Sequence, residues 1–183
     1  MGIDPGFGIM GWGVIKLTGE EVSLIDYGAI ETDKEQDFGQ RLCQINDRLA
    51  SLFEEYKPDD IAIEELFFAA NVTTGLKVAA ARGIALMRAT YYHGEVFNYK
   101  PNQIKIAMTG GCKAKKKEMQ LAVGKILNQE QKIKPDDAAD ALAMELGRRG
   151  IPYAIHDLAG NNEESLGVSG ALRDVFKYDT IVA

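Results

Sequence analysis

The sequence predicts an α/β fold with a five-stranded mixed sheet flanked by helices on both faces. Short, largely apolar segments typical of strands are interspersed with longer segments in which apolar residues recur every three or four positions. Three strand-like segments precede the first helical one, and strands and helices alternate afterwards. This order indicates a mixed sheet covered by helices on both sides.

The first part of the chain is predicted to contain three strands and one helix. Pro5 and Gly6 stop the first strand after Asp4. The tight turn Thr18-Gly19-Glu20 joins the next two strands in a hairpin. Pro58 ends the helix, because the residue before a proline disfavours helical backbone. The predicted bounds are Trp12–Leu17 and Val22–Glu31 for the hairpin strands and Leu42–Tyr56 for the helix.

The second part of the chain is predicted to alternate strands and helices. Asp60–Glu64 is short and mostly apolar, which is typical of a strand covered on both faces. Thr73–Tyr92 is an alanine-rich helix, largely apolar all round, and is therefore expected in the core or at an interface. The strand Val96–Tyr99 is stopped by Pro101. The two remaining predicted helices are Lys115–Asn128 and Pro135–Arg149, the second with a proline at its first position.

Length and composition fit one globular domain. The chain has 183 residues, of which 46% are apolar and 26% are charged, both ordinary values. No apolar run approaches the roughly 20 residues of a membrane helix, and the start lacks the pattern of a signal peptide. Cys43 and Cys112 are too few and too far apart for a disulfide framework or a zinc cluster. We therefore expect a cytoplasmic protein that does not associate with membranes.

The net charge of −6 argues weakly against a nucleic-acid-binding protein. The distribution of charge matters more than its sum, however. Six lysines fall in one short stretch, with only Glu118 opposing them at its end: Lys100, Lys105, Lys113, Lys115, Lys116 and Lys117. An acidic protein with one basic segment, and with carboxylates that metal ions neutralise, can still bind DNA.

Four carboxylates are predicted to converge at one edge of the sheet. Asp4 ends the first strand and Glu64 ends the fourth, and functional sites of open α/β sheets usually form at strand ends. Asp137 and Asp140 are three residues apart on the last predicted helix, so they share a face of it. Side chains from two strand ends and one helix face can therefore meet at one point.

Converged carboxylates repel one another unless a cation neutralises them. A set of oxygen ligands without histidine or cysteine favours Mg²⁺, with Mn²⁺ as a substitute, over zinc. Two such ions about 3.5–4 Å apart form the arrangement used for phosphodiester hydrolysis, in which one ion activates water and the other stabilises the leaving 3′ oxygen. The pattern therefore favours a nuclease whose acidic residues act as metal ligands.

Taken singly, most of these acids also have a structural explanation. Asp4 can belong to an ordinary Asp-Pro-Gly turn, and Glu64 to a solvated strand end. Asp137 can interact favourably with the dipole at a helix N-terminus. Asp140 is harder to explain in this way, because it lies in an apolar helical segment where an unpaired, buried carboxylate is costly.

The ordered motifs resemble the RuvC family of Holliday-junction resolvases from about residue 2 to residue 149. Each motif alone is weak, whereas the set in this order is strong. The matching segments are Gly2-Ile3-Asp4-Pro5-Gly6, Gly11-Trp12-Gly13-Val14-Ile15, Ala62–Phe67 with Asn71, Arg82-Gly83, the basic segment Lys113–Gln120, and Asp136–Ala143.

The resemblance implies an RNase H-like fold for residues 1–149 and a magnesium-dependent endodeoxyribonuclease. It implies that the enzyme is a homodimer and resolves four-way DNA junctions by paired symmetric nicks. It assigns the catalytic, metal-binding roles to Asp4, Glu64, Asp137 and Asp140, with two ions per active site. Branch-migration proteins are further expected partners.

Three further residues match DNA contacts of the family. Phe67 matches an aromatic that stacks at the junction, and an exposed aromatic can support an unstacked base; the alternative is an ordinary core residue. Lys105 and Lys116 match lysines that contact DNA, and lysines can hold phosphates without reading sequence; the alternative is a solvated charged surface. Two nicks require two active sites and hence a twofold dimer, for which the helix Thr73–Tyr92 is the candidate interface.

The two ends of the chain depart from the family pattern. Only Met1-Gly2-Ile3 precede Asp4, where several apolar residues are expected, and the extension 150–183 matches no part of the family. The ending Tyr178–Ala183 is strand-like. One hypothesis is that it completes the first strand, and the alternative is an unrelated extension.

Three other functions remain open at this point. Another RNase H-like nuclease, acting on RNA or on other branched DNA, would use the same metal site. A non-catalytic junction-binding module would bind without cleaving. A nucleotide-binding domain of the actin or sugar-kinase type shares a sheet and an early Asp-Gly turn, but Gly110-Gly111 is too little for the second phosphate loop that such a domain needs.

Overall fold

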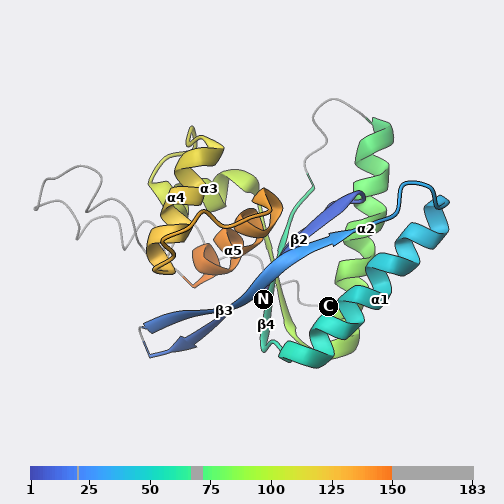
Figure 1. The fold of residues 1–183 in the computed structure, drawn as a ribbon, viewed down its shortest axis with the longest axis horizontal. Helices are drawn as coiled ribbons and strands as arrows, with labels where there is room; N and C mark the ends of the chain where they lie inside the picture. The colour runs from blue at the N-terminus through green and yellow to red at the C-terminus, as the bar shows by residue number, and fades with distance from the viewer. Residues whose placement is uncertain (20, 67–71, 150–183) are drawn as a thin grey trace, which may run out of the picture.

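A mixed five-stranded sheet runs through the middle of the computed structural model, which describes residues 1–19, 21–66 and 72–149 (Figure 1). The strands are β1 (Gly2–Asp4), β2 (Ile9–Thr18), β3 (Glu21–Glu31), β4 (Asp60–Glu64) and β5 (Glu95–Tyr99). The helices are α1 (Phe38–Tyr56), α2 (Val72–Tyr92), α3 (Pro101–Thr109), α4 (Lys116–Ile126) and α5 (Asp136–Arg148).

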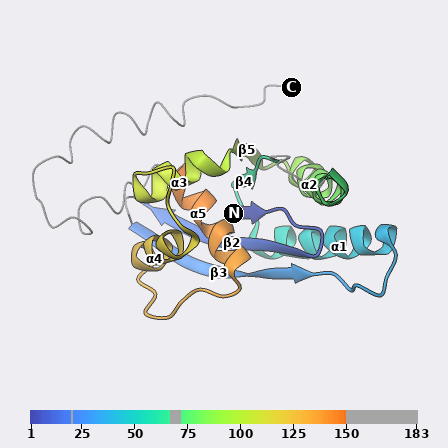
Figure 2. The ribbon, with the colours of Figure 1, turned by 90° about the horizontal axis from the view of Figure 1, so that it is seen from above.

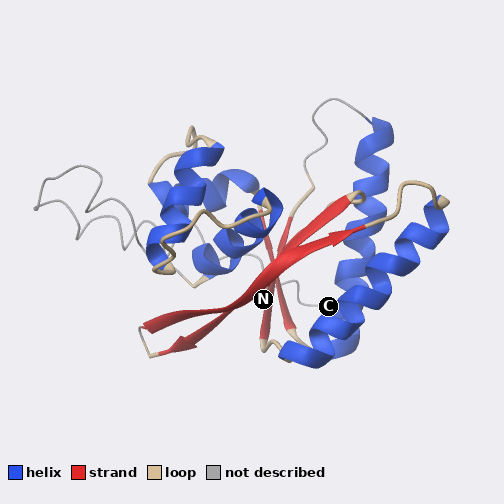
Figure 3. Ribbon diagram, viewed as in Figure 1, coloured by secondary structure: helices blue, strands red, loops and turns tan. Residues whose placement is uncertain are grey.

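The strand order is β3-β2-β1-β4-β5, which places the short strand β1 at the centre of the sheet. β1 pairs antiparallel with β2 and parallel with β4, while β2–β3 is antiparallel and β4–β5 is parallel. The prediction of a five-stranded mixed sheet is therefore confirmed. The red strands in Figure 3 lie between two groups of blue helices, and Figure 2 shows the same layers from above.

The two faces of the sheet carry separate cores. Along β4, Ile61 and Ile63 pack in the core beneath α1 and α2, whereas Ala62 belongs to the core formed with α3, α4 and α5. This alternation follows from the strand geometry, in which successive side chains point to opposite faces. Both helical layers predicted from the sequence are thus present.

Helix α5 lies directly against the sheet because two strands present glycine to it. A Cβ atom at Gly2 of β1 would lie 1.9 Å from the Ala141 carbonyl oxygen, and one at Gly11 of β2 would lie 2.0 Å from the Asp137 carbonyl oxygen. Only glycine permits such a close approach of backbone to backbone. Because Gly11 pairs with Asp4 across the β1–β2 ladder, the first turn of α5 is held beside Asp4.

Helix α3 is the main element that the sequence analysis did not predict. Pro101 follows the end of β5 as expected, but it also occupies the first turn of α3, where its fixed φ angle and missing N–H are tolerated. Conversely, Pro135 was expected at the first position of the last helix, and this prediction is wrong. Pro135 is the N-cap residue, with an extended backbone, and the helix begins at Asp136. Strand β2 begins at Ile9 rather than at Trp12.

The extension 150–183 lies outside the described residues, so the hypothesis that it completes the first strand stays a prediction. Within the described ranges, no helix combines the length and the apolar character that are needed to cross a membrane.

Gly11→Ala is expected to destabilise the fold. The added methyl group would meet the Asp137 backbone, which can give way only if α5 moves off β2. We expect the free energy of unfolding, measured by urea denaturation, to fall by about 1–3 kcal/mol or more. Gly111→Ala is the matched control, because a Cβ atom at this position would have no heavy atom within 4 Å. This variant should change the free energy of unfolding by less than about 0.5 kcal/mol. Equal stabilities of the two variants would contradict this packing.

Candidate metal and DNA site

Asp4 and Glu64 lie side by side at the carboxyl ends of two adjacent parallel strands. Ile3 of β1 pairs with Ile63 of β4, so the two acids that follow end their strands together. Both residues are only partly exposed. The parallel register of the central strands thus brings together two carboxylates that are far apart in the sequence.

The other two acids come from the start of α5. Asp137 lies in the first turn of this helix, and Asp140 follows three residues later. The contact of Gly11 with the Asp137 backbone holds this turn over the end of β1. The charges of Asp137, Asp140 and Glu64 all act on Asp4. The structure therefore brings the four predicted acids to one edge of the sheet.

Burial and mutual repulsion disfavour ionisation of this group. Burial raises the pKa of Asp4 to about 8, and the charges of Glu64, Asp140 and Asp137 add to the effect. Burial also raises the pKa of Glu64, although a hydrogen bond with Asp4 acts in the opposite direction. The pKa of Asp140 is likewise raised by burial, against the influence of Lys116. A bound divalent cation would favour the ionised forms.

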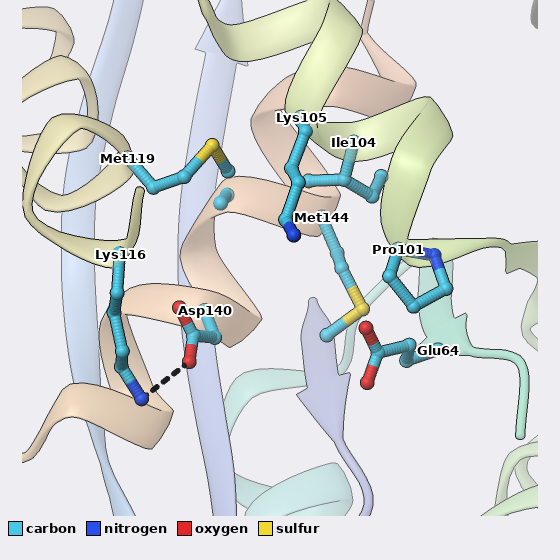
Figure 4. A pocket seen from close by; sticks show the side chains of 9 residues that line it. Glu64, Pro101, Ile104, Lys105, Lys116, Met119, Asp140 and Met144 are labelled. Carbon is cyan, nitrogen blue, oxygen red and sulfur yellow. Dashed lines mark ion pairs between the residues drawn. The ribbon is translucent and has the colours of Figure 1, made fainter. Parts of the chain in front are cut away.

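Two lysines face the acids across a cavity of about 280 Å³ (Figure 4). Lys105 comes from α3, and Lys116 is the first residue of α4. The Lys116 Nζ atom lies 3.0 Å from the Asp140 Oδ2 atom, and the charge of Lys105 acts on Glu64. The apolar walls of the cavity include Pro101, Ile104, Met119 and Met144. The two lysines singled out from the sequence thus lie in one cavity with two of the acids.

The carboxylate oxygens of the four acids are suitable ligands for a hard divalent cation. In the present side-chain conformations, however, they do not surround a position where an ion could bind. Within the described ranges, no three Asp, Glu, His or Cys side chains are grouped closely enough to hold an ion. The Asp140 carboxylate is engaged by Lys116 instead. All four converging donors are carboxylates, which suit Mg²⁺ and Mn²⁺, and burial together with the neighbouring acids raises the pKa of Asp4. Ligation by Asp140 would therefore require its carboxylate to exchange Lys116 for the cation.

Phe67 and Arg82 lie on either side of what the sequence allowed us to predict about this site. Phe67 lies outside the described residues, so its stacking role stays a prediction. Arg82 of α2, which the sequence analysis noted only as part of a motif, donates a hydrogen bond from Nε to the Glu64 carbonyl oxygen at 2.8 Å. The available signal was weak, since it consisted of one arginine inside an alanine-rich helical segment.

Comparisons with known proteins agree with this arrangement. A family model described as "Crossover junction endodeoxyribonuclease RuvC" matches residues 1–148. A curated protein of the same description from Alkaliphilus metalliredigens is 47% identical over 144 residues, which cover 79% of this chain and 88% of that protein.

Solved structures show the same fold. The Thermus thermophilus RuvC structure matches with a TM-score of 0.75 and 31% identity, covering 81% of this chain and 92% of that one. T. thermophilus RuvC in complex with Holliday junction substrate matches with a TM-score of 0.75 and 32% identity, covering 79% and 88% of the two chains. The predicted RNase H-like fold is thereby confirmed.

Asp4→Asn is expected to stabilise the metal-free protein, increasingly so as the pH rises. The pKa of Asp4 is about 8 in the folded protein, against an ordinary value of 3.8. Between these values the folded state holds a proton that the unfolded chain has lost, so the wild type loses stability with rising pH. Asparagine does not titrate. The gain in melting temperature, measured in EDTA from about pH 4.5 to about pH 8.5, should therefore grow. A gain that is independent of pH would refute this description of Asp4.

Proposed function

Because the chain belongs to the RuvC family of crossover junction endodeoxyribonucleases, we propose that it resolves four-way DNA junctions by paired symmetric nicks. The observation that carries the proposal is the meeting of Asp4, Glu64, Asp137 and Asp140 beside a cavity that contains two lysines. The complex of T. thermophilus RuvC with Holliday junction substrate supports the same class of substrate.

The four carboxylates are the proposed ligands of Mg²⁺, for which Mn²⁺ can substitute, with two ions in each site. The family is metal-dependent. Bound ions would supply an activated water and stabilise the charge on the leaving 3′ oxygen. The protein's own part is to hold Asp4 and Glu64 on rigid strand ends and Asp137 and Asp140 on a helix pressed against them. A site built on such elements keeps its ligands in place during the reaction.

Lys105 and Lys116 are the proposed contacts to the DNA backbone near the cut. Both line the cavity that contains Glu64 and Asp140. Lys116 neutralises Asp140 in the metal-free protein, and its ammonium is free to approach a phosphate once a cation takes over that carboxylate. Phe67, three residues beyond Glu64, remains the proposed aromatic for an unpaired base, a contact worth about 1–3 kcal/mol.

Paired nicks require two active sites, and we assign the dimer contact to α2. The buried residues of this helix are three alanines, Ala81, Ala85 and Ala89. Ile84, Leu86 and Tyr92 pack partly buried against the core, whereas four other large apolar side chains are exposed, namely Val72, Leu76, Met87 and Tyr91. Exposed apolar groups along one element are typical of an interface, and a twofold dimer satisfies them in both copies at once. We also predict action in the cytoplasm and cooperation with branch-migration proteins.

The proposed function is tested by nicking of a four-way junction in Mg²⁺, compared with linear duplex and an RNA–DNA hybrid. The wild type should nick the junction at symmetric positions. Asp137→Asn should lose more than about a hundredfold in rate, because even groups that only support a metal ligand contribute 10–100-fold. Its affinity for the junction in EDTA should be retained, since the lysine contacts are intact.

Asp136→Asn is the matched control for this assay. Asp136 neighbours Asp137, but it is paired with Lys132 at 3.1 Å on the exposed side of the helix, so its variant should nick like the wild type. Equal cleavage of the duplex or the hybrid would favour another RNase H-like nuclease. Tight junction binding without nicking would favour a non-catalytic module.

Lys116→Ala is expected to weaken junction binding and to flatten its dependence on salt. Loss of one phosphate contact should reduce the slope of log K against log salt by about 1, as measured by fluorescence anisotropy at saturating Mg²⁺ in the non-cleaving Asp137→Asn background, where the cation can release Lys116 from Asp140. Lys113→Ala is the control, because Lys113 belongs to the same basic stretch but does not line the cavity. Identical slopes for the two variants would remove Lys116 from the DNA path.

A further inference from the structure

Arg82 of α2 bridges the ends of two neighbouring strands. Its Nε atom donates a hydrogen bond to the Glu64 carbonyl oxygen at 2.8 Å, and its Nη2 atom donates one to Asn98 Oδ1 at 2.5 Å. Glu64 ends β4, and Asn98 lies opposite Ile63 in the β4–β5 ladder. One helical side chain thus holds both strands at the point where β4 leaves the sheet.

The groups in this contact are costly to leave without a partner. The Arg82 side chain is partly buried where it meets the two strands, so its charge is partly removed from water. Asn98 is only 4% exposed, and within the described part of the chain its Nδ2 atom has no hydrogen-bond partner. The bond from Arg82 to Oδ1 therefore fixes the orientation of this amide. Buried polar contacts of this kind make a local structure rigid.

Glu64 needs such a fixed point because it ends β4 and lines the same cavity as Asp140. A ligand on a strand end holds an ion in place only if its own backbone is held. Strand β4 ends at Glu64. The amide of the next residue, Glu65, donates a hydrogen bond to the Tyr99 carbonyl oxygen of β5 at 2.8 Å. The direction of the Glu64 carboxylate therefore depends on the backbone behind it, which the bonds to Arg82 and Tyr99 hold on either side.

We propose that Arg82 is a positioning residue that holds Glu64 in the place where it binds a divalent cation. This inference rests on the proposed function and identifies a determinant of metal affinity on a helix that supplies none of the ligands. Arg82 touches the Glu64 backbone and not the reacting groups, so it is not a catalytic residue. Its planar guanidinium presents several donors in a fixed geometry, which lets it reach two strands at once; the single ammonium of a lysine does not.

The test is Mn²⁺ binding by the DNA-free protein, followed through the electron paramagnetic resonance signal of free Mn²⁺. Arg82→Gln is expected to weaken Mn²⁺ binding by about 10–100-fold. The same variant should need a correspondingly higher Mg²⁺ concentration for half-maximal nicking, while its junction affinity in EDTA stays unchanged. Arg82→Lys should bind Mn²⁺ with intermediate affinity.

Arg88→Gln is the matched control. Arg88 lies on the same helix and is also partly buried, but its Nε atom donates to Asn46 of α1 at 2.7 Å rather than to the sheet. Its loss should leave Mn²⁺ binding unchanged, even if it lowers the melting temperature. A purely structural arginine at position 82 would behave like Arg88.

The outcomes separate this inference from the proposed function. If Arg82→Gln binds Mn²⁺ as tightly as the wild type, the inference is wrong, whatever its melting temperature; if this variant does not fold, Arg82→Lys is judged by the same criterion. If Arg82→Gln keeps its metal affinity while Asp137→Asn loses nicking, only the inference fails. If the wild type itself neither binds Mn²⁺ nor nicks junctions, the proposed function fails.

Discussion

The site depends on the direct contact between the backbone of α5 and the two strands beneath it. Gly2 and Gly11 allow this contact because any side chain at either position would collide with the helix backbone. The contact sets both the height of α5 above the sheet and its position along the strands. It thereby decides how close Asp137 and Asp140 come to Asp4. Because β1 is the central strand, Asp4 also has Glu64 beside it on β4.

The acidic side chains at the two ends of α5 have opposite electrostatic surroundings. Near its C-terminus, Glu145 is almost fully buried, but the Nε atoms of Arg148 and Arg149 each lie 3.2 Å from its Oε1 atom. Near the N-terminus, the partly exposed Asp4 lies beside other acids, and its pKa rises because burial and the charges of Glu64, Asp140 and Asp137 disfavour ionisation. A buried acid whose charge is balanced by neighbouring arginines, such as Glu145, is explained by folding alone. A cluster of acids whose pKa values are raised by burial and repulsion destabilises the metal-free fold and is typical of a functional site.

Much of the fold was predictable because its signals are local. Apolar periodicity, turn residues and prolines predicted all five strands and four of the five helices within the described residues. Helix α3 was missed because Pro101 was interpreted only as the end of a strand, although a proline also suits the first turn of a helix. The same helix carries Lys105, so its place beside Glu64 followed from the family resemblance and not from the predicted elements.

The convergence of the acids was predictable from strand ends and helix spacing, whereas their supports were not. No sequence pattern indicates that Lys116 pairs with Asp140 or that Arg82 reaches the Glu64 backbone, since both contacts depend on how α4 and α2 pack on the rest of the fold. The same holds for α2 itself. Its apolar composition predicted either a core or an interface, and only the packing separates the core-facing alanines, with Ile84 and Leu86, from the exposed Leu76 and Met87.

The central claim is that the four acids form one metal site, and anomalous diffraction from crystals grown with Mn²⁺ tests it most directly. We expect anomalous peaks at the edge of the sheet, within about 2.0–2.3 Å of carboxylate oxygens of Asp4 and Glu64 and of at least one α5 acid. We also expect Asp140 to have turned away from Lys116. Peaks only elsewhere on the surface, or crystals without any peak at saturating Mn²⁺, would contradict it.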